Sequence, residues 1–280
     1  GEDTLSLHDA LPIYQRGGMR TLLAKTAEEQ AKISNAMLGL TKMDIAAYLA
    51  RPAGCVLVDP LCAVPGLVDE GVLHRSTGLL IGLDASGFDL TPEGYRISNM
   101  VEGITARRVR ELGGTGAKIM IYLRSDVAAA NTVNMATLER VIAEFAAEDL
   151  LLVVEFLTYA LPDEAPEAYA AKIPSLIEGG SKLCLDAGSK VLKIPYPGTP
   201  QACANITAMC GDVPWAVLSA GVDHATFLGQ VETSMANGAS GVIAGRSLWK
   251  DCISLDRSVT KERLETIAVP RLREIQAVIA

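Results

Sequence analysis

Residues 189–197 read SKVLKIPYP, which predicts a short buried β-strand with a lysine in its middle and two prolines at its end. Side chains alternate along a strand, so Val191 and Lys193 share one face while Leu192 and Ile194 share the other. Burial of an ammonium group is costly, and a lowered pKa is its usual consequence. A lysine of this kind is a nucleophile for carbonyl groups. The alternative is a lysine at a strand end that reaches solvent or pairs with a carboxylate.

Similar apolar runs recur on both sides of this stretch, and amphipathic segments separate them. Such alternation is typical of parallel βα units whose strands are covered on both faces. We expect helices at 26–38, 42–50, 98–112, 135–148, 167–185, 224–237 and 260–278. We expect strands at 55–58, 78–83, 118–123, 150–157, 191–196, 216–219 and 241–244.

The first residues differ in character from the rest of the chain. One frame of a common sequencing adapter encodes the segment HDALPI at 8–13, so we interpret residues 1–14 as a non-native leader and 15–280 as one domain. Residues 5–13 must then serve as the first strand, although they contain Pro12, and proline cannot donate to a central ladder. With the seven runs, this segment predicts a single α/β domain, a (β/α)8 TIM barrel. The alternative is an open doubly wound sheet, but no GxGxxG or Walker loop follows an early strand.

Composition restricts the classes of function. The 280 residues are 49% hydrophobic and carry a formal net charge of −8, which argues against nucleic acid or an anionic membrane as a partner. A few basic residues in a pocket can still bind an anionic small molecule. No apolar run approaches the ~20 residues of a membrane span, and no signal segment opens the chain, so we expect a cytoplasmic protein.

Cysteine and histidine usage bears on metals and disulfides. The six cysteines form no CxxC pair, and the three histidines form no HxH or HExxH motif. We therefore expect neither disulfides nor a metal, and no other cofactor. The sequence leaves homo-oligomerisation open.

In a barrel of this kind, the active site lies at the carboxyl ends of the strands. Lys118, Glu155 and Lys193 occur in three successive runs and would face one mouth if they point inward. A carboxylate inside an apolar run is either paired with a cation or held protonated for use. A structural salt bridge between Glu155 and Lys118 is the alternative to a catalytic role.

The last two strands end in small residues. LSAG at 218–221 and AGRS at 244–247 would let backbone N–H groups approach an anion, and these two loops are the usual phosphate site of the barrel. Arg246 adds a guanidinium that can bind phosphate in bidentate fashion. Ser219, Gly221, Gly245 and Arg246 are therefore candidate phosphate ligands.

Two further candidates have structural alternatives. Arg124, in the segment RSD at 124–126, could bind a second anion or form a surface pair with Asp126. Asp59, at the end of the second strand, could contact a substrate hydroxyl or merely start the turn.

These residues, taken together, resemble the tagatose-1,6-bisphosphate aldolases and, within that family, the sulfofructosephosphate aldolases. The motifs that carry the resemblance span nearly the whole chain: QRG at 15–17, LVDP at 57–60, Lys118, RSD at 124–126, VE at 154–155 with Tyr159, VLK at 191–193, PW at 214–215, LSAGV at 218–222 and AGR at 244–246 with Trp249.

The resemblance implies a TIM-barrel class I aldolase without a metal or other cofactor. It assigns the Schiff base to Lys193, acid/base chemistry to Glu155, a second active-site lysine to Lys118 and the C1 phosphate to Ser219, Gly221, Gly245 and Arg246. Gln15, Arg124 and Asp59 complete the expected substrate contacts. The family has aspartate immediately before Gln-Arg, where this chain has Tyr14.

The implied reaction is cleavage of a ketose 1-phosphate to dihydroxyacetone phosphate and a three-carbon aldehyde. The RSD segment is similar to the sulfo-sugar branch, whereas Asp59-Pro60 and the segment 219–221 are similar to the tagatose branch. Two alternatives are a catalytically impaired barrel that binds sugar phosphate as a regulator, and a barrel isomerase in which Lys193 acts electrostatically.

Overall fold

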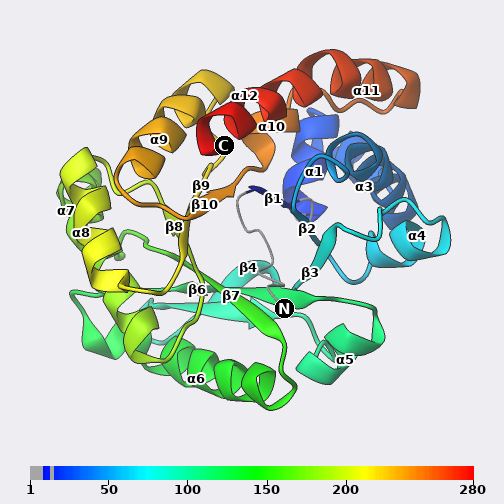
Figure 1. Ribbon diagram of the computed structural model, residues 1–280. Helices are drawn as coiled ribbons and strands as arrows, with labels where there is room; N and C mark the ends of the chain where they lie inside the picture. The colour runs from blue at the N-terminus through cyan, green and yellow to red at the C-terminus, as the bar shows by residue number, and fades with distance from the viewer. Residues whose placement is uncertain (1–8, 13–15) are drawn as a thin grey trace.

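The computed structural model describes residues 9–12 and 16–280. Eight parallel strands are hydrogen-bonded in the order β1-β10-β9-β8-β7-β6-β3-β2 and form a closed barrel (Figure 1). Their bounds are β1 Asp9–Pro12, β2 Cys55–Val58, β3 Gly78–Gly82, β6 Gly116–Tyr122, β7 Leu151–Leu157, β8 Leu192–Pro195, β9 Trp215–Leu218 and β10 Gly241–Ile243. The prediction of an α/β fold with parallel strands is confirmed.

The alternation of side chains along the strands produces two separate apolar layers. One buried cluster lies inside the barrel and contains Cys55, Leu57 and Val191. A second, larger cluster lies between strands and helices and contains Val56, Leu192 and Ile194. Because Val191 faces the interior and side chains alternate, Lys193 also projects inward, as its sequence predicts.

Helices surround the strands (Figure 1). Those between β1 and the hairpin are α1 Arg16–Leu23, α2 Ala27–Lys32, α3 Asn35–Leu49 and α4 Val64–Asp69. The remainder are α5 Ala106–Glu111, the 3-10 turn Ala128–Asn131, α6 Thr132–Ala147, α7 Pro166–Asp186, α8 Pro200–Cys210, α9 His224–Ala236, α10 Arg246–Trp249, α11 Arg257–Arg263, a π turn Leu264–Ala268 and α12 Val269–Ile279.

The end of the chain is fastened to its beginning by polar contacts. The Arg257 guanidinium binds the Asp44 carboxylate through Nε and Nη2, both at 2.7 Å. Gln276 Nε2 donates to Pro52 O at 2.6 Å. Figure 1 shows the result, with α11 beside α3. The last helices therefore complete the outer layer over the first ones.

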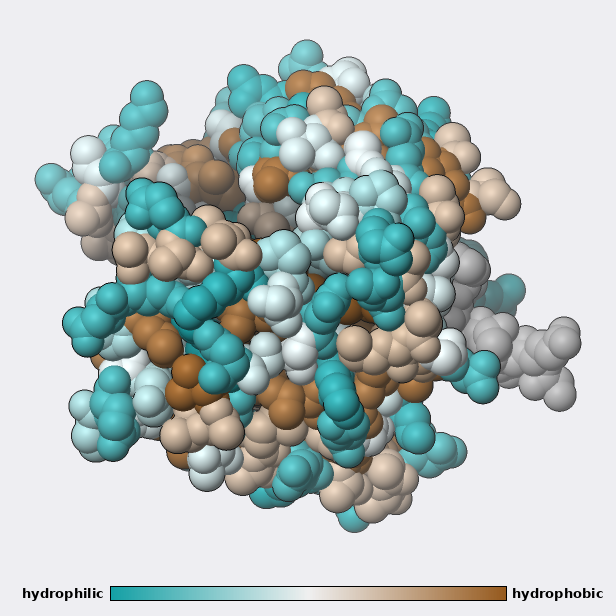
Figure 2. All heavy atoms as spheres, turned by 90° about the vertical axis from the view of Figure 1, so that its left-hand side faces the viewer, coloured by the Kyte–Doolittle hydropathy of each residue, from teal (hydrophilic) through white to brown (hydrophobic). Residues whose placement is uncertain are grey.

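The outer surface of α7 and α8 faces the viewer in Figure 2. Polar side chains are interspersed there with apolar ones. Both helices bury apolar residues on their inner sides, including Leu176 and Ile177 in α7 and Ile206 in α8. None of the helices that the structure describes is long and apolar enough to cross a membrane.

One predicted helix, 98–112, is wrong over most of its length. Residues 84–100 form an antiparallel hairpin from β4 Asp84–Leu90 and β5 Arg96–Met100, and only Ala106–Glu111 is helical. The helix starts late because the Thr105 side chain accepts a hydrogen bond from Arg108 N and caps it. The hairpin has no apolar run of its own, and it is held by contacts with β6 and α6 that its local sequence does not encode.

The helix boundaries near the N-terminus also need correction. Thr26 caps α2, and together with Glu29 it forms a capping box. The predicted helix 26–38 ends early, however, because Ser34 accepts from Met37 N and starts a new helix. That helix, α3, includes residues 42–49 of the segment 42–50 that was expected to be a separate helix. The predicted helix 260–278 is likewise divided by the π turn.

The predicted first strand, 5–13, is only partly described. Residues 5–8 and 13 lie outside the described residues, as do Tyr14 and Gln15. Within the described part, β1 pairs in parallel with β10 through Asp9 and Ala10, and with β2 through Ala10, Leu11 and Pro12.

Candidate active site

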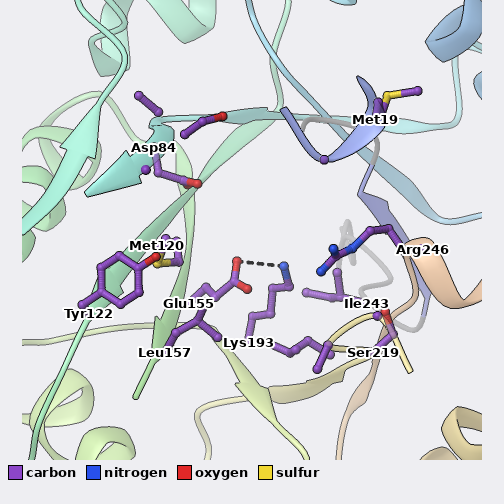
Figure 3. A pocket seen from close by; sticks show the side chains of 18 of the residues that line it. Met19, Asp84, Met120, Tyr122, Glu155, Leu157, Lys193, Ser219, Ile243 and Arg246 are labelled. Carbon is purple, nitrogen blue, oxygen red and sulfur yellow. Dashed lines mark hydrogen bonds and ion pairs between the residues drawn. The ribbon is translucent and has the colours of Figure 1, made fainter. Parts of the chain in front are cut away.

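A pocket of about 400 Å³ opens at the carboxyl ends of the barrel strands. Inward-facing residues from β6, β7 and β8 form its floor, including Met120, Glu155 and Lys193. The loops after β3, β9 and β10 form its walls. Figure 3 shows the charged groups of Glu155, Lys193, Asp84 and Arg246 directed into this space.

Lys193 occupies the centre of the floor. Its strand is in register with Glu155 of β7 and Ala216 of β9. The side chain is 4% exposed, and Nζ donates to Glu155 Oε2 at 2.8 Å. Burial lowers the pKa of Lys193 and the positive charge of Lys118 lowers it further, whereas Glu155 opposes the shift. A larger share of this lysine is therefore the neutral amine than for a lysine in water.

Glu155 lies between two lysines. Its Oε2 is 2.8 Å from Lys193 Nζ and 3.1 Å from Lys118 Nζ. Burial alone would raise the pKa of Glu155, but the charges of Lys118 and Lys193 outweigh burial and hold the pKa below its ordinary value. The carboxylate is consequently ionised at neutral pH. The salt bridge with Lys118 that was the structural alternative does form, and it forms in the pocket floor.

Lys118 lies one layer below the pocket. It faces inward two residues before Met120, in register with Val153 of β7, and its side chain is fully buried. Its Nζ is 2.5 Å from Asp84 Oδ1 as well as 3.1 Å from Glu155 Oε2. Lys118 thus connects two carboxylates and places its charge close to Lys193.

Asp84 was missed by the sequence analysis. It is 7% exposed and lines the pocket, because it follows Leu80 and Gly82 on the inward face. Burial raises the pKa of Asp84, partly offset by the charge of Lys118. Asp84 stands directly after the run 78–83, so the rule that selected Asp59 as a polar residue after a strand could also have found it.

The loops after β9 and β10 bring together the candidate phosphate ligands. Ser219, Gly221, Gly245 and Arg246 all line the pocket. Gly221 has φ +80°, and a Cβ there would lie 3.2 Å from the Arg246 guanidinium carbon, so both conformation and space favour glycine. Lys250 Nζ donates to Gly221 O at 2.7 Å and fixes the loop.

Trp249 adds an unused donor to the same wall. It lines the pocket, and its buried indole N–H has no hydrogen-bond partner among the residues that the structure describes. Buried polar groups usually have a partner, so this donor suits a polar ligand.

Arg124 is not among the residues that line the pocket, and its expected role as a second anion site stays a prediction. Its guanidinium is fully buried and binds Asp126 at 2.8 and 2.9 Å, Tyr159 O at 2.8 Å and the Glu164 carboxylate. Hydrogen bonds from Arg124 hold the pKa of Glu164 at about 2. The structure shows the alternative, an Arg/Asp pair, with Arg124 buried and Asp126 partly exposed. Glu164 lies too far along the sequence for a local motif to reveal it.

Asp59 is also outside the pocket. Its Oδ1 accepts from Leu61 N at 3.1 Å and Cys62 N at 2.6 Å, and its Oδ2 binds buried Lys42. These bonds make it the start of a turn, which was the structural alternative. Gln15 lies outside the described residues.

Comparisons with known proteins agree with this geometry. The model of the family described as DeoC/LacD family aldolase matches residues 40–251. A tagatose 1,6-diphosphate aldolase of Listeria monocytogenes is 28% identical over 273 residues, covering 88% of this chain and 78% of the Listeria protein. A tagatose 1,6-diphosphate aldolase of Staphylococcus aureus is 24% identical over 299 residues, covering 96% of this chain and 90% of that protein.

Solved structures share the fold. A Schiff-base-forming fructose-1,6-bisphosphate aldolase superposes with a TM-score of 0.65 at 17% identity, covering 97% of this chain and 94% of the other. A fructose-bisphosphate aldolase from Slackia heliotrinireducens superposes with a TM-score of 0.64 at 18% identity, covering 96% of this chain and 84% of the other.

Proposed function

Since this chain belongs to the DeoC/LacD family of aldolases, which makes it a carbon-carbon lyase, we propose that it works as a class I aldolase with Lys193 as the Schiff-base residue. The observation that carries the proposal is the position of Lys193. It is a buried lysine with a lowered pKa, at the floor of a pocket and 2.8 Å from an ionised glutamate. The lowered pKa increases the share of the neutral amine, which is the form that attacks a carbonyl.

The proposed substrate is a ketose 1-phosphate. Arg246 and the loops at Ser219, Gly221 and Gly245 offer charge and backbone N–H groups for the C1 phosphate. The names of the Listeria and Staphylococcus relatives support tagatose 1,6-bisphosphate as the substrate. 6-Deoxy-6-sulfofructose 1-phosphate is the second candidate, from the sequence resemblance.

The chemistry begins at C2 of the substrate. Neutral Lys193 attacks the C2 ketone to give a carbinolamine, whose hydroxyl takes a proton from solvent and leaves as water, so that a protonated imine remains. The C3–C4 bond then breaks, and its electron pair moves into the imine to give an enamine, while Glu155 accepts the proton of the C4 hydroxyl. This step releases the three-carbon aldehyde.

Protonation of the enamine at C3 and hydrolysis of the imine release dihydroxyacetone phosphate and restore Lys193. In this scheme Lys118 has two effects on its neighbours. It keeps Glu155 ionised and lowers the pKa of Lys193.

Reductive trapping tests the proposal. Borohydride reduces an imine but not an ammonium group, so treatment with dihydroxyacetone phosphate should leave a three-carbon adduct on Lys193, located by peptide mass spectrometry. Lys193→Met is the matched control and should give no adduct. An adduct on Lys118 alone, or none in the unaltered protein, would overturn the assignment.

A further inference from the structure

An aromatic cluster surrounds Arg96 beside the pocket. Arg96 Cζ lies 4.2 Å from the ring centroid of Phe88, 5.0 Å from that of Tyr159 and 5.2 Å from that of Tyr122. Tyr122 packs edge-to-face against both other rings, with centroids 5.5 Å from Phe88 and 5.9 Å from Tyr159. Tyr122 lines the pocket, whereas Arg96 is not itself among the lining residues and contacts the Tyr122 ring.

This cluster lies across the pocket from Arg246. Tyr122 ends β6 and Arg246 follows β10, and in the closed strand order β6 is the fourth strand from β10 in either direction. Figure 3 shows the same relation, with Tyr122 and Arg246 on opposite sides of the Lys193–Glu155 pair. A sugar chain with its C1 phosphate at Arg246 and C2 at Lys193 therefore extends toward Tyr122.

The Arg96 guanidinium keeps its hydrogen-bonding capacity. Within residues 9–12 and 16–280, its side chain makes no ion pair and no hydrogen bond, only the three ring contacts. A guanidinium stacked on a ring still presents its N–H groups in its own plane, where they can bind two oxygens of an oxyanion. Arg124, in contrast, already binds Asp126 and Glu164.

The backbone around Arg96 is held in place. Arg96 N donates to the Tyr159 hydroxyl at 3.2 Å, and Arg96 O accepts from Asn134 Nδ2 at 2.8 Å. The same Asn134 Nδ2 donates to Tyr122 O at 2.8 Å. A side chain on a fixed backbone loses less conformational freedom when it binds a ligand.

We infer that Arg96, on its cluster of Phe88, Tyr122 and Tyr159, binds the anionic group at the far end of the substrate, a phosphate or a sulfonate. This inference rests on the proposed function. It makes Arg96 a specificity residue for sugars that carry two anionic groups. Lys193 and Glu155, in contrast, act on sugars with or without the far anion.

The test compares kcat/KM for substrates with and without the far anion. Tagatose 1,6-bisphosphate and 6-deoxy-6-sulfofructose 1-phosphate are each measured against tagatose 1-phosphate, which lacks the far anion. The variant is Arg96→Met, because methionine keeps the packing on the rings and removes the charge. The control is Arg107→Met, on an exposed arginine of α5 that is paired with Glu111.

The ratio to compare is kcat/KM for a sugar with the far anion divided by kcat/KM for tagatose 1-phosphate. Loss of a charge-assisted contact should lower this ratio by about 10- to 100-fold in Arg96→Met and leave it unchanged in Arg107→Met. A fall for the bisphosphate alone identifies phosphate as the bound group, and a fall for the sulfonate alone identifies sulfonate. Arg96→Lys keeps the charge but not the planar fork, so its ratio should lie between those of the unaltered protein and Arg96→Met.

Unchanged ratios in Arg96→Met, with Lys193 still trapped by borohydride, would overturn the inference and leave the proposed function standing. If Arg96→Met does not fold, as judged by circular dichroism, the same kcat/KM ratios measured for Arg96→Lys decide whether Arg96 binds the far anion. Failure of all three sugars to react, with no adduct on Lys193, would remove the proposed function and this inference together.

Discussion

Two lysines and two carboxylates in the pocket floor control one another's protonation. Lys118 contacts both Asp84 and Glu155, and Glu155 contacts Lys193. The pKa shifts follow from this arrangement: those of Lys193 and Glu155 are lowered and that of Asp84 is raised. A change at one member should therefore alter the pH dependence of another.

Lys118→Met should move the reaction of Lys193 to higher pH. The charge of Lys118 contributes to the lowered pKa of Lys193, so its removal raises that pKa, and the neutral amine then appears only at higher pH. The measurement is the rate of borohydride trapping as a function of pH. Loss of Lys118 also removes the charge that lowers the pKa of Asp84, so the pKa of Asp84 should rise further in this variant.

Lys182→Met is a suitable control, since Lys182 is exposed and pairs only with Asp186 on α7 among the described residues. Its pH profile should match that of the unaltered protein. A Lys118→Met profile displaced to lower pH, or not displaced, would show that Lys118 does not govern Lys193.

The residues of the site differ in how far their sequence revealed them. Lys193 and Glu155 could be selected because a charge inside an apolar run is rare and local. Arg96 gave no such signal, because its significance comes from Tyr122 and Tyr159, which lie on other elements. For Arg124 the sequence left a second anion and a pair with Asp126 as alternatives, and it gave no sign of Glu164, which is 40 residues away.

Among the elements, the β4–β5 hairpin forms part of the pocket wall. It supplies Asp84 from its first strand, and the first residue of its second strand is Arg96. At its turn, Thr91 N donates to Tyr95 O and Gly94 N donates to Thr91 O, both at 2.9 Å. Gly94 has φ +83°, and a Cβ there would lie 2.7 Å from Pro162 Cγ.

Gly94→Ala should lower the melting temperature by several degrees. The positive φ and the contact with the proline ring each oppose a side chain, at about 1–3 kcal/mol of strain for such a backbone, and about 2–4 °C is lost per kcal/mol in a domain of this size. Thermal unfolding followed by circular dichroism measures the effect.

Gly229→Ala in α9 is the matched control. A Cβ at Gly229 meets nothing within 4 Å, and alanine is the better helix former, so the melting temperature should rise slightly. If Gly94→Ala had the same melting temperature as the unaltered protein, the turn would not be held against Pro162 as the geometry indicates.

For the whole molecule, closure of the barrel depends on β1. This strand lies between β10 and β2, and it includes Pro12, which has no N–H to donate to a neighbour. We predict that exchange of residues 1–14 for an apolar strand without proline, ending in aspartate, raises both the melting temperature and the aldolase activity. The reasons are a complete ladder and the aspartate that the resemblance implies before Gln-Arg, where this chain has Tyr14.

The same exchange with the final aspartate replaced by asparagine separates the two effects: it should keep the gain in stability and lose the gain in activity. Equal melting temperature and equal turnover before and after the exchange would contradict the interpretation of residues 1–14 as a non-native leader.

The sequence by itself determined seven strands of the barrel, their parallel arrangement and the face that Lys193 shares with Val191, because these follow from the alternation of side chains and of β and α segments along the chain. Only the tertiary structure decided which charges meet. Lys118 and Asp84 are 34 residues apart, and Glu155 and Lys193 are 38 apart. Such pairs depend on which strands become neighbours when the barrel closes, and for that reason the hairpin, the carboxylate partners of Arg124 and the aromatic cluster around Arg96 could not be obtained from local patterns.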